Sequence, residues 1–376
     1  MTAGTVRARA AISNGHGGFD IDDIEVDAPG AGEVRVRIVA SGLCHTDHQS
    51  LTWLGPLVMG HEGAGVIESV GAGVKQLNLG QRVLLNWAIP CGRCPRCAAG
   101  QGALCERTLG VDAALGSSDA SPGNTRWRGA PIGRAFRLGT LSELTVVRAE
   151  AVTPMPEALP LHHACILGCG VMTGVGSVMN SAQVQPGDSV AVLGCGGVGL
   201  SVIQGARIAG AGLIIAVDRR SESLDRARAF GATDMVPVAA DDVDLHSAAA
   251  KVRQLTDGRG VDHAFEATGV DRLAFAPLRF VRNGGTALQV SGAHGEARVN
   301  VLDFWWDKRY LVPLYGGCQP ERDFPRLAHW ALEGRLDLRG MVTRRYALDA
   351  LPQAMDDLLA GRNIKGVIEF ATETAA

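Results

Sequence analysis

The sequence predicts an α/β fold that joins a doubly wound parallel sheet to a second, β-rich domain. Between about residues 170 and 314, strand-like and helix-like segments alternate, which is typical of βαβ units. Residues 1 to about 165 instead show short alternating strands broken by glycine and proline, which favours a barrel-like domain. The length of 376 residues exceeds one ordinary hydrophobic core, so two domains are expected.

In the β-rich region, four segments have strand patterning: EVRVRIVA, AGVIESVG, QRVLLNW and SELTVV. Residues 109–137 are rich in Gly, Ser, Asp and Arg and have no period, so we predict a long surface loop or insertion there.

The alternating region begins with the strand SVAVLG and continues through a helix over Gly197–Ala209, the strand LIIAVD and a helix over Ser221–Phe230. Two later strands, VDHAFEATG and GTALQVSG, flank a predicted helix over 272–281. The end of the chain carries two helical patterns and a strand, VIEFAT. We therefore expect a β-rich domain over 1–170, a parallel-sheet domain over 171–314, and a return to the first domain over 315–376.

The composition excludes several classes of protein. The chain is 46% hydrophobic and 20% charged, as in soluble globular proteins. Its net charge of −3 gives no reason to expect binding to nucleic acid or to an anionic membrane surface. No signal peptide is evident, and no apolar run reaches the roughly 18 residues of a membrane span. Nine cysteines without a secretion signal favour a reducing compartment, so we expect a cytoplasmic protein.

Seven cysteine and histidine residues form two predicted zinc-ligand sets. The compact set lies within 91–105 and fills all four tetrahedral positions, which is typical of a structural zinc lobe: Cys91, Cys94, Cys97 and Cys105. The scattered set spans 126 positions and would leave one position open for water or substrate: Cys44, His61 and Cys169. Spacing by itself cannot pair such distant ligands. Three cysteines are left over as predicted buried thiols: Cys165, which stands four residues before Cys169, Cys195 and Cys318.

A glycine-rich loop follows the strand SVAVLG and opens a helix. Its pattern G-x-G-x-x-G, with Gly197 and Val198 inside it, is set by Gly194, Gly196 and Gly199. Asp218 stands 19 residues beyond the last glycine, at the end of the next strand. This context predicts a Rossmann-type dinucleotide site, with the pyrophosphate at the helix N-terminus and Asp218 on the adenosine ribose. A carboxylate there favours NAD over NADP, although Arg219 and Arg220 directly after it offer a partner for a phosphate.

The motifs CHTD, GHEGAG, LGCG, GCGGVG and GRNIKGVIEF, with the cysteine lobe, run nearly from end to end. In this combination the chain resembles the zinc-dependent alcohol dehydrogenases of the medium-chain dehydrogenase/reductase superfamily. The resemblance implies a GroES-like catalytic domain, NAD, two zinc ions per chain and a small alcohol or aldehyde as substrate. It also implies hydride transfer to NAD from a zinc-bound alkoxide.

The resemblance assigns further roles residue by residue. The scattered set matches the catalytic zinc ligands, and Thr46 matches the hydroxyl that hydrogen-bonds the bound alcohol. Asp47 matches the carboxylate that orients the ligand histidine, and Glu62 the acid beside the zinc. His45 and Lys365 match positions that contact the coenzyme pyrophosphate, where relatives often carry Arg in place of Lys365.

One position departs from the pattern. Many relatives carry a histidine at the end of the proton relay, where this chain has Gln49. Glutamine cannot act as a base near neutral pH, and His48 stands one residue early. Water or His48 would therefore complete the relay.

Three stretches, LLNWAIPCGRCPRC, ILGCGVMTGVGS and LYGGCQPERDFPRL, look most like thiol-dependent formaldehyde dehydrogenases, especially the mycothiol-dependent ones. Leu109 replaces an arginine of the glutathione-dependent enzymes, which argues against that carrier. The implied substrate pocket favours an aromatic or medium-sized apolar alcohol and is lined by Trp87, Leu138 and Ala293. Core packing is the alternative for Trp87.

The insertion at 109–137 resembles that of dimeric relatives, so we expect a homodimer, and Trp305–Trp306 then serve packing or a subunit contact. Two other readings stay open: a reductase with only the structural zinc, and a non-catalytic NAD-sensing module.

Overall fold

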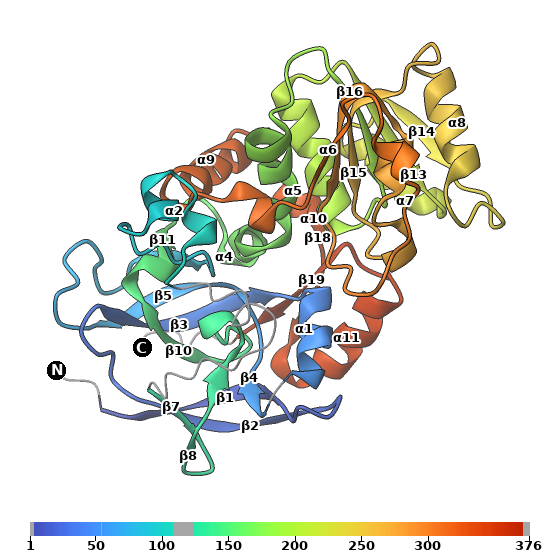
Figure 1. Ribbon diagram of the computed structural model, residues 1–376. Coiled ribbons are helices and arrows are strands. Elements are labelled where there is room, and N and C mark those ends of the chain that lie inside the picture. The colour runs from blue at the N-terminus through green and yellow to red at the C-terminus, as the bar shows by residue number, and fades with distance from the viewer. Residues whose placement is uncertain (1–3, 54, 108–123, 371–376) are drawn as a thin grey trace. The chain divides into compact units, whose positions relative to one another are not determined.

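The computed structural model describes residues 4–53, 55–107 and 124–370 (Figure 1). The chain forms two compact units. The first unit contains both ends of the chain: Met1–Cys169, Gln319–Glu333 and Leu338–Ala376. The second unit contains Gly170–Cys318 and Gly334–Asp337. Leu109 and much of the predicted insertion lie outside the described residues.

The first unit is built on two sheets, ordered β8-β7-β2-β1-β4-β9 and β11-β6-β5-β3-β19-β18, with β10 paired to β3. Its strands are β1 (Val6–Ser13), β2 (Phe19–Val26), β3 (Glu33–Gly42), β4 (Leu57–Val58), β5 (Glu62–Val70), β6 (Arg82–Leu85), β7 (Thr125–Trp127), β8 (Ala130–Pro131), β9 (Gly133–Arg134), β10 (Leu144–Arg148), β11 (Val152–Pro154), β18 (Val342–Ala347) and β19 (Lys365–Glu369). Its helices are α1 (His45–Gln49), α2 (Pro95–Ala98), α4 (Leu161–Ala164), α9 (Pro320–Leu332), α10 (Leu338–Met341) and α11 (Leu351–Leu359).

The two ends of the chain meet in the sheet that positions the scattered ligand set. β3 pairs with β5 on one side and with β19 on the other, so Gly42 lies opposite both Glu62 and Val367. Alternating apolar side chains of these strands fill the core, among them Val36, Ile38 and Ile368. The end of β3, the start of β5 and the start of β19 are thereby held side by side.

The second unit is a six-stranded sheet in the order β14-β13-β12-β15-β16-β17, and every neighbouring pair is parallel. Its strands are β12 (Ser189–Leu193), β13 (Leu213–Asp218), β14 (Asp234–Pro237), β15 (Val261–Glu266), β16 (Val281–Gln289) and β17 (Arg309–Leu311), and its helices are α5 (Gly170–Gly176), α6 (Gly197–Ala209), α7 (Ser221–Phe230) and α8 (His246–Gln254) (Figure 1). The strand order reverses between β12 and β15, which is the switch point where such sheets bind ligands. The predicted α/β class is confirmed.

One predicted element is wrong. The segment 272–281 is not an α-helix but two short 3₁₀ turns, Asp271–Leu273 and Ala276–Arg279, and Val281 already begins β16. Pro277 lies in the second turn, and its missing N–H removes a bond that a continuous helix would need. Part of the segment predicted as a loop also has structure, because β7, β8 and β9 fall within 125–134.

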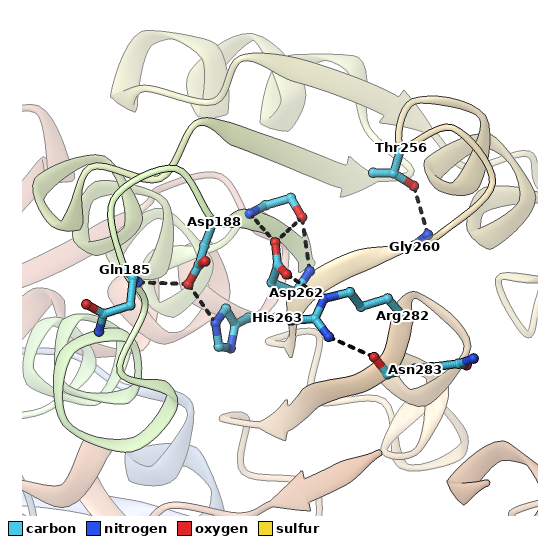
Figure 2. A network of polar contacts seen from close by, with 9 residues as sticks. Gln185, Asp188, Thr256, Gly260, Asp262, His263, Arg282 and Asn283 are labelled. Atoms are coloured by element: carbon cyan, nitrogen blue, oxygen red, sulfur yellow. Dashed lines mark hydrogen bonds and ion pairs between the residues drawn. The ribbon is translucent and has the colours of Figure 1, made fainter. Parts of the chain in front are cut away.

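A polar network joins the N-terminal ends of the central strands (Figure 2). Asp262 accepts hydrogen bonds from the backbone N–H and hydroxyl of Ser189, at 2.8 and 2.6 Å, and pairs with Arg282 Nε at 2.6 Å. His263 Nε2 lies 3.1 Å from Asp188 Oδ2. These contacts hold together the N-terminal ends of β12, β15 and β16, whereas the glycine loop follows the C-terminal end of β12.

Within the described ranges, no single helix has both the length and the apolar character to cross a membrane, and one bent helix pair, Leu161–Gly168 with Gly170–Ala182, meets those criteria only when taken together.

Candidate active site

The scattered ligand set comes together in the first unit. Cys44 caps the N-terminus of α1, His61 precedes β5, and Cys169 follows a 3₁₀ turn over Cys165–Gly168. Ligand atoms of these three residues and of Glu62 all lie within 4.8 Å of one another. Glycine at position 168 lets the segment before Cys169 pass close to the end of β6, because a Cβ there would lie 2.8 Å from the carbonyl oxygen of Leu85.

Asp47 orients this set from the first turn of α1. One carboxylate oxygen accepts the backbone N–H of Cys44 at 2.8 Å, and the other lies 3.0 Å from His61 Nδ1. Both Asp47 and His61 are 1% exposed. His61 Nε2 is buried without a hydrogen-bond partner in the described residues, which fits a metal ligand whose other ring nitrogen is held by a carboxylate.

The two thiols interact as well. Their hydrogen bond lowers the pKa of Cys44 well below its usual value and raises that of Cys169. A thiolate is the form that binds metal, so a cation among these residues would replace the thiol protons. Two sulfurs and one imidazole nitrogen form a donor set suited to zinc.

The carboxylate of Glu62, which lies beside the three ligand residues, forms an ion pair with Lys365. Lys365 Nζ lies 2.7 Å from this carboxylate and donates to the carbonyl oxygen of Leu43 at 3.0 Å. Both charged side chains are buried. A Cβ on Gly42 would lie 2.2 Å from Glu62 Oε2, so this carboxylate needs glycine at the end of β3. Lys365, predicted at the coenzyme pyrophosphate, thus has its ammonium group paired within the first unit.

The remaining predicted residues of α1 differ in exposure. Thr46 is half-buried, and its hydroxyl oxygen lies 3.7 Å from Cys44 Sγ. His45 and His48 are exposed, and Gln49 is half-buried. The Thr46 hydroxyl therefore lies next to the ligand set.

The compact cysteine set forms a separate lobe around α2. Its four sulfurs lie within 4.8 Å of one another. The backbone N–H groups of Cys97 and Cys91 donate to the sulfurs of Cys94 and Cys105, at 3.4 and 3.3 Å. The bond from Cys97 lowers the pKa of Cys94, whereas burial raises that of Cys97 to about 12. The donor set fits a structural zinc. The three leftover cysteines are buried, as expected.

An aromatic cluster lies against His61, and its central member, Phe136, was not predicted from sequence. The Phe136 ring centroid lies 4.7 Å from that of His61, 5.5 Å from that of Trp87 and 5.6 Å from that of Trp53. Phe136 has φ of 53°, a left-handed conformation that is rare for a bulky residue. Of the predicted pocket residues, Leu138 is fully buried in the first unit, while Ala293 is half-buried in the second.

The glycine loop of the second unit has the geometry of a phosphate cradle. Gly194 has φ of 89°, and a Cβ on Gly199 would lie 1.9 Å from the carbonyl oxygen of Gly194. Gly196 caps α6, and a Cβ there would meet nothing within 4 Å. Gly197 and Val198 form the first turn of the helix. The loop is thus tightly folded on one side and open on the other, as a bound pyrophosphate requires.

Asp218 is fixed at the end of β13. Its two carboxylate oxygens accept backbone N–H groups, from Cys195 at 2.8 Å and from Arg220 at 2.9 Å. The side chains of Arg219 and Arg220 are exposed. The carboxylate of Asp218 is therefore held against the glycine loop by Cys195, whereas the side chains of the two arginines are exposed to solvent.

Comparison with known proteins agrees with this geometry. Residues 30–157 match the alcohol dehydrogenase GroES-like domain and residues 197–333 the zinc-binding dehydrogenase domain. An S-(hydroxymethyl)glutathione dehydrogenase of Escherichia coli O139:H28 is 34% identical over 97% of this chain and 100% of its own length.

Two solved structures have the same fold over nearly the whole chain. An alcohol dehydrogenase zinc-binding domain protein from Burkholderia ambifaria has a TM-score of 0.89 and 32% identity, covering 98% of this chain and 100% of its own. Benzyl alcohol dehydrogenase from Acinetobacter calcoaceticus has a TM-score of 0.88 and 28% identity, covering 97% and 100%. The chain belongs to the zinc-dependent alcohol dehydrogenases of the medium-chain dehydrogenase/reductase superfamily. It is an oxidoreductase.

Proposed function

We propose that this chain catalyses the NAD-linked oxidation of an alcohol to an aldehyde or ketone, and the reverse reduction. The observation that carries the proposal is the convergence of two thiols and one imidazole beside a carboxylate that Lys365 already binds. Three ligands leave one tetrahedral position for an alcohol. Membership of the family supports the same reaction class.

Different residues of the first unit would bind the metal, orient a metal ligand and transfer the proton. A zinc ion held by Cys44, His61 and Cys169 would supply Lewis acidity, which lowers the pKa of an alcohol hydroxyl. Asp47 holds the His61 ring by Nδ1, so that Nε2 would be the nitrogen that binds the metal. The Thr46 hydroxyl accepts the proton of the alcohol and passes a proton outward to solvent. The exposed imidazole of His48 lies outside this path.

The second unit, Gly170–Cys318 with Gly334–Asp337, would be the coenzyme domain. The loop over 194–199 would receive the pyrophosphate, and Asp218 would accept hydrogen bonds from the adenosine ribose hydroxyls. Its carboxylate would repel a 2′-phosphate. NAD, bound there, would supply the hydride acceptor. His45 and Lys365 remain proposed contacts of the coenzyme from the first unit.

The aromatic cluster supports an aromatic or medium-sized apolar alcohol as the substrate. Phe136 places ring surface beside His61 and contacts Trp87, and such surface favours apolar groups over charged ones. Leu138 and Ala293 are the other proposed pocket residues. One similar structure is named for benzyl alcohol, which has this chemistry.

A thiol-dependent reaction on an S-hydroxymethyl adduct of formaldehyde is the second candidate. The observation in its favour is the 34% identity to an S-(hydroxymethyl)glutathione dehydrogenase over nearly the whole chain. Mycothiol is the carrier that the sequence motifs favour. A non-catalytic NAD-sensing module would bind NAD without turning over either kind of substrate.

Steady-state assays with NAD distinguish these candidates. The panel is benzyl, allyl and short aliphatic alcohols, and formaldehyde with and without mycothiol or glutathione. Turnover of benzyl alcohol that falls in Phe136→Ala supports the aromatic pocket. Turnover of formaldehyde only with a thiol supports the second candidate, and NAD binding without any turnover contradicts both.

We also propose that the protein is a cytoplasmic homodimer. None of the nine cysteines forms a disulfide in the described residues, as a reducing compartment favours. β17 has β16 as its sole neighbour among the described strands, so one of its sides offers unpaired backbone groups. The segments next to it in the sequence carry exposed apolar side chains: Val301, Leu302, Trp305, Trp306 and Val312. A second copy of the chain is self-complementary to such an edge.

A further inference from the structure

Glu266 is a fully buried acid at the carboxyl end of β15, beside the switch point of the sheet. Its partners in the described part of the chain are neutral hydrogen-bond donors. One oxygen, Oε1, accepts the backbone N–H of Thr268 at 2.6 Å, the Thr268 hydroxyl at 2.5 Å and the backbone N–H of Gly269 at 3.1 Å. The other oxygen accepts the hydroxyl of Ser291.

These bonds join two loops that follow neighbouring strands. Thr268 and Gly269 belong to the loop after β15, and Ser291 belongs to the loop after β16. The main chain reinforces the connection, because the N–H of Val290 donates to the carbonyl oxygen of Glu266 at 2.9 Å. A buried network with every acceptor satisfied is rigid, so the two loops hold one arrangement relative to each other.

The same network reaches the phosphate cradle. Thr268 Cγ2 would lie 2.9 Å from a Cβ placed on Gly194, so its methyl group packs against the first glycine of the loop. The N–H of Ala267 donates to the carbonyl oxygen of Leu193 at 2.8 Å. Glu266 therefore fixes the loops after β15 and β16 and, through Thr268, their position against the glycine loop.

The sheet order tells which half of the dinucleotide these loops face. Asp218, at the end of β13, marks the adenosine side, and the glycine loop after β12 marks the pyrophosphate. A dinucleotide bound across the switch point places its other half over the strands on the far side, which here are β15 and β16. The loops tied by Glu266 would thus lie beside the nicotinamide half of a bound dinucleotide.

We infer that Glu266 is a positioning residue for the nicotinamide half of the coenzyme, acting through Thr268 and Ser291. The inference rests on the proposed use of NAD. It predicts that loosening the network weakens the binding of NADH but not the binding of ADP-ribose. ADP-ribose carries the adenosine, the pyrophosphate and the second ribose but no nicotinamide.

Two variants loosen the network at a single hydroxyl each. Thr268→Val keeps the shape and the methyl contact but loses the hydroxyl, and Ser291→Ala removes the donor from the other loop. Thr268→Ser is the matched control, since it keeps the hydroxyl. Asp262→Asn is the second control, because it breaks a carboxylate network at the opposite end of β15.

The measurements are the Kd of NADH, from its fluorescence on binding, the Kd of ADP-ribose, from calorimetry, and the melting temperature. We expect the Kd of NADH divided by the Kd of ADP-ribose to rise about tenfold in Thr268→Val and Ser291→Ala. This is the scale of one hydrogen bond to a charged group. Thr268→Ser and Asp262→Asn should keep the wild-type ratio within about twofold, even where the melting temperature falls.

A ratio unchanged in both loosening variants, or raised equally in Asp262→Asn, would overturn the positioning role and leave the proposed function intact. Wild-type protein that binds neither ligand would contradict the proposed function itself, and this inference with it.

Discussion

Among single residues, Thr46 has the clearest chemical consequence. Its hydroxyl lies 3.7 Å from the sulfur of Cys44, while the imidazole of His48 is exposed. Thr46→Val keeps the shape and removes the proton acceptor, so turnover should fall on the order of 100-fold. His48→Gln should cost under about tenfold and leave the pH dependence of alcohol oxidation unchanged. An ionisation near neutral pH that disappears in His48→Gln would instead identify His48 as the relay base.

Asp218 is the residue on which coenzyme choice depends. Two backbone N–H groups hold its carboxylate, so it cannot turn away from a 2′-phosphate. Asp218→Ala should raise the KM for NAD about 10- to 150-fold through the lost hydrogen bonds. The KM for NADP should rise less or fall, because the repulsion is removed. Steady-state kinetics with both coenzymes measures the difference. Wild-type protein that uses both equally would refute this role.

At the scale of elements, the polar network at the N-terminal ends of β12, β15 and β16 (Figure 2) makes the free energy of unfolding depend on pH. Partial burial opposes ionisation of Asp262, but hydrogen bonds from Ser189 and Arg282 outweigh it and lower the pKa of Asp262 to about 2. An unfolded aspartate has a pKa of about 3.9. The stabilisation is therefore complete above about pH 4 and is lost as the pH falls toward 2.

Asp262→Asn should then lower the free energy of unfolding by about 1–2 kcal/mol at pH 7, allowing for partial exposure. The deficit should shrink as the pH falls from 5 to 2, because the wild-type carboxyl becomes protonated. Denaturant unfolding across that range measures it. A deficit that is constant with pH would mean that the charge of Asp262 is not the cause.

Elements with local signals were the ones that the sequence could predict. The helix Gly197–Ala209 was expected because a glycine loop and an apolar period define it, and the helix forms as expected. The segment 272–281 has an apolar period too, but Pro277 interrupts the backbone bonding. Phe136 and Glu266 carried no local signal, because their roles depend on contacts made by distant strands. Tertiary contacts of this kind, such as Glu62 with Lys365, cannot be read from spacing.

For the whole molecule, the two ligand sets predict metal content. Purified protein should hold about two zinc ions per chain. Cys169→Ser should remove one of them and abolish turnover with little loss of stability. Cys97→Ser should remove the other and lower the melting temperature, because the lobe over 91–105 would lose its closed ligand set. Elemental analysis with thermal unfolding separates the two. One zinc in the wild type would favour a reductase with only the structural metal.

The exposed edge of the second unit predicts the state of assembly. Val312 directly follows β17 and is 64% exposed. Val243 is 52% exposed and lies before α8, which packs against β14 at the other end of the strand order. A charge at Val312 would be desolvated between two copies, whereas a charge at Val243 would stay in water. Val312→Asp should therefore raise the dimer dissociation constant at least about tenfold, and Val243→Asp should leave it unchanged. Sedimentation equilibrium against the chain mass of 39.3 kDa measures both. A monomeric wild type, or an equal effect of the two variants, would exclude this edge as the interface.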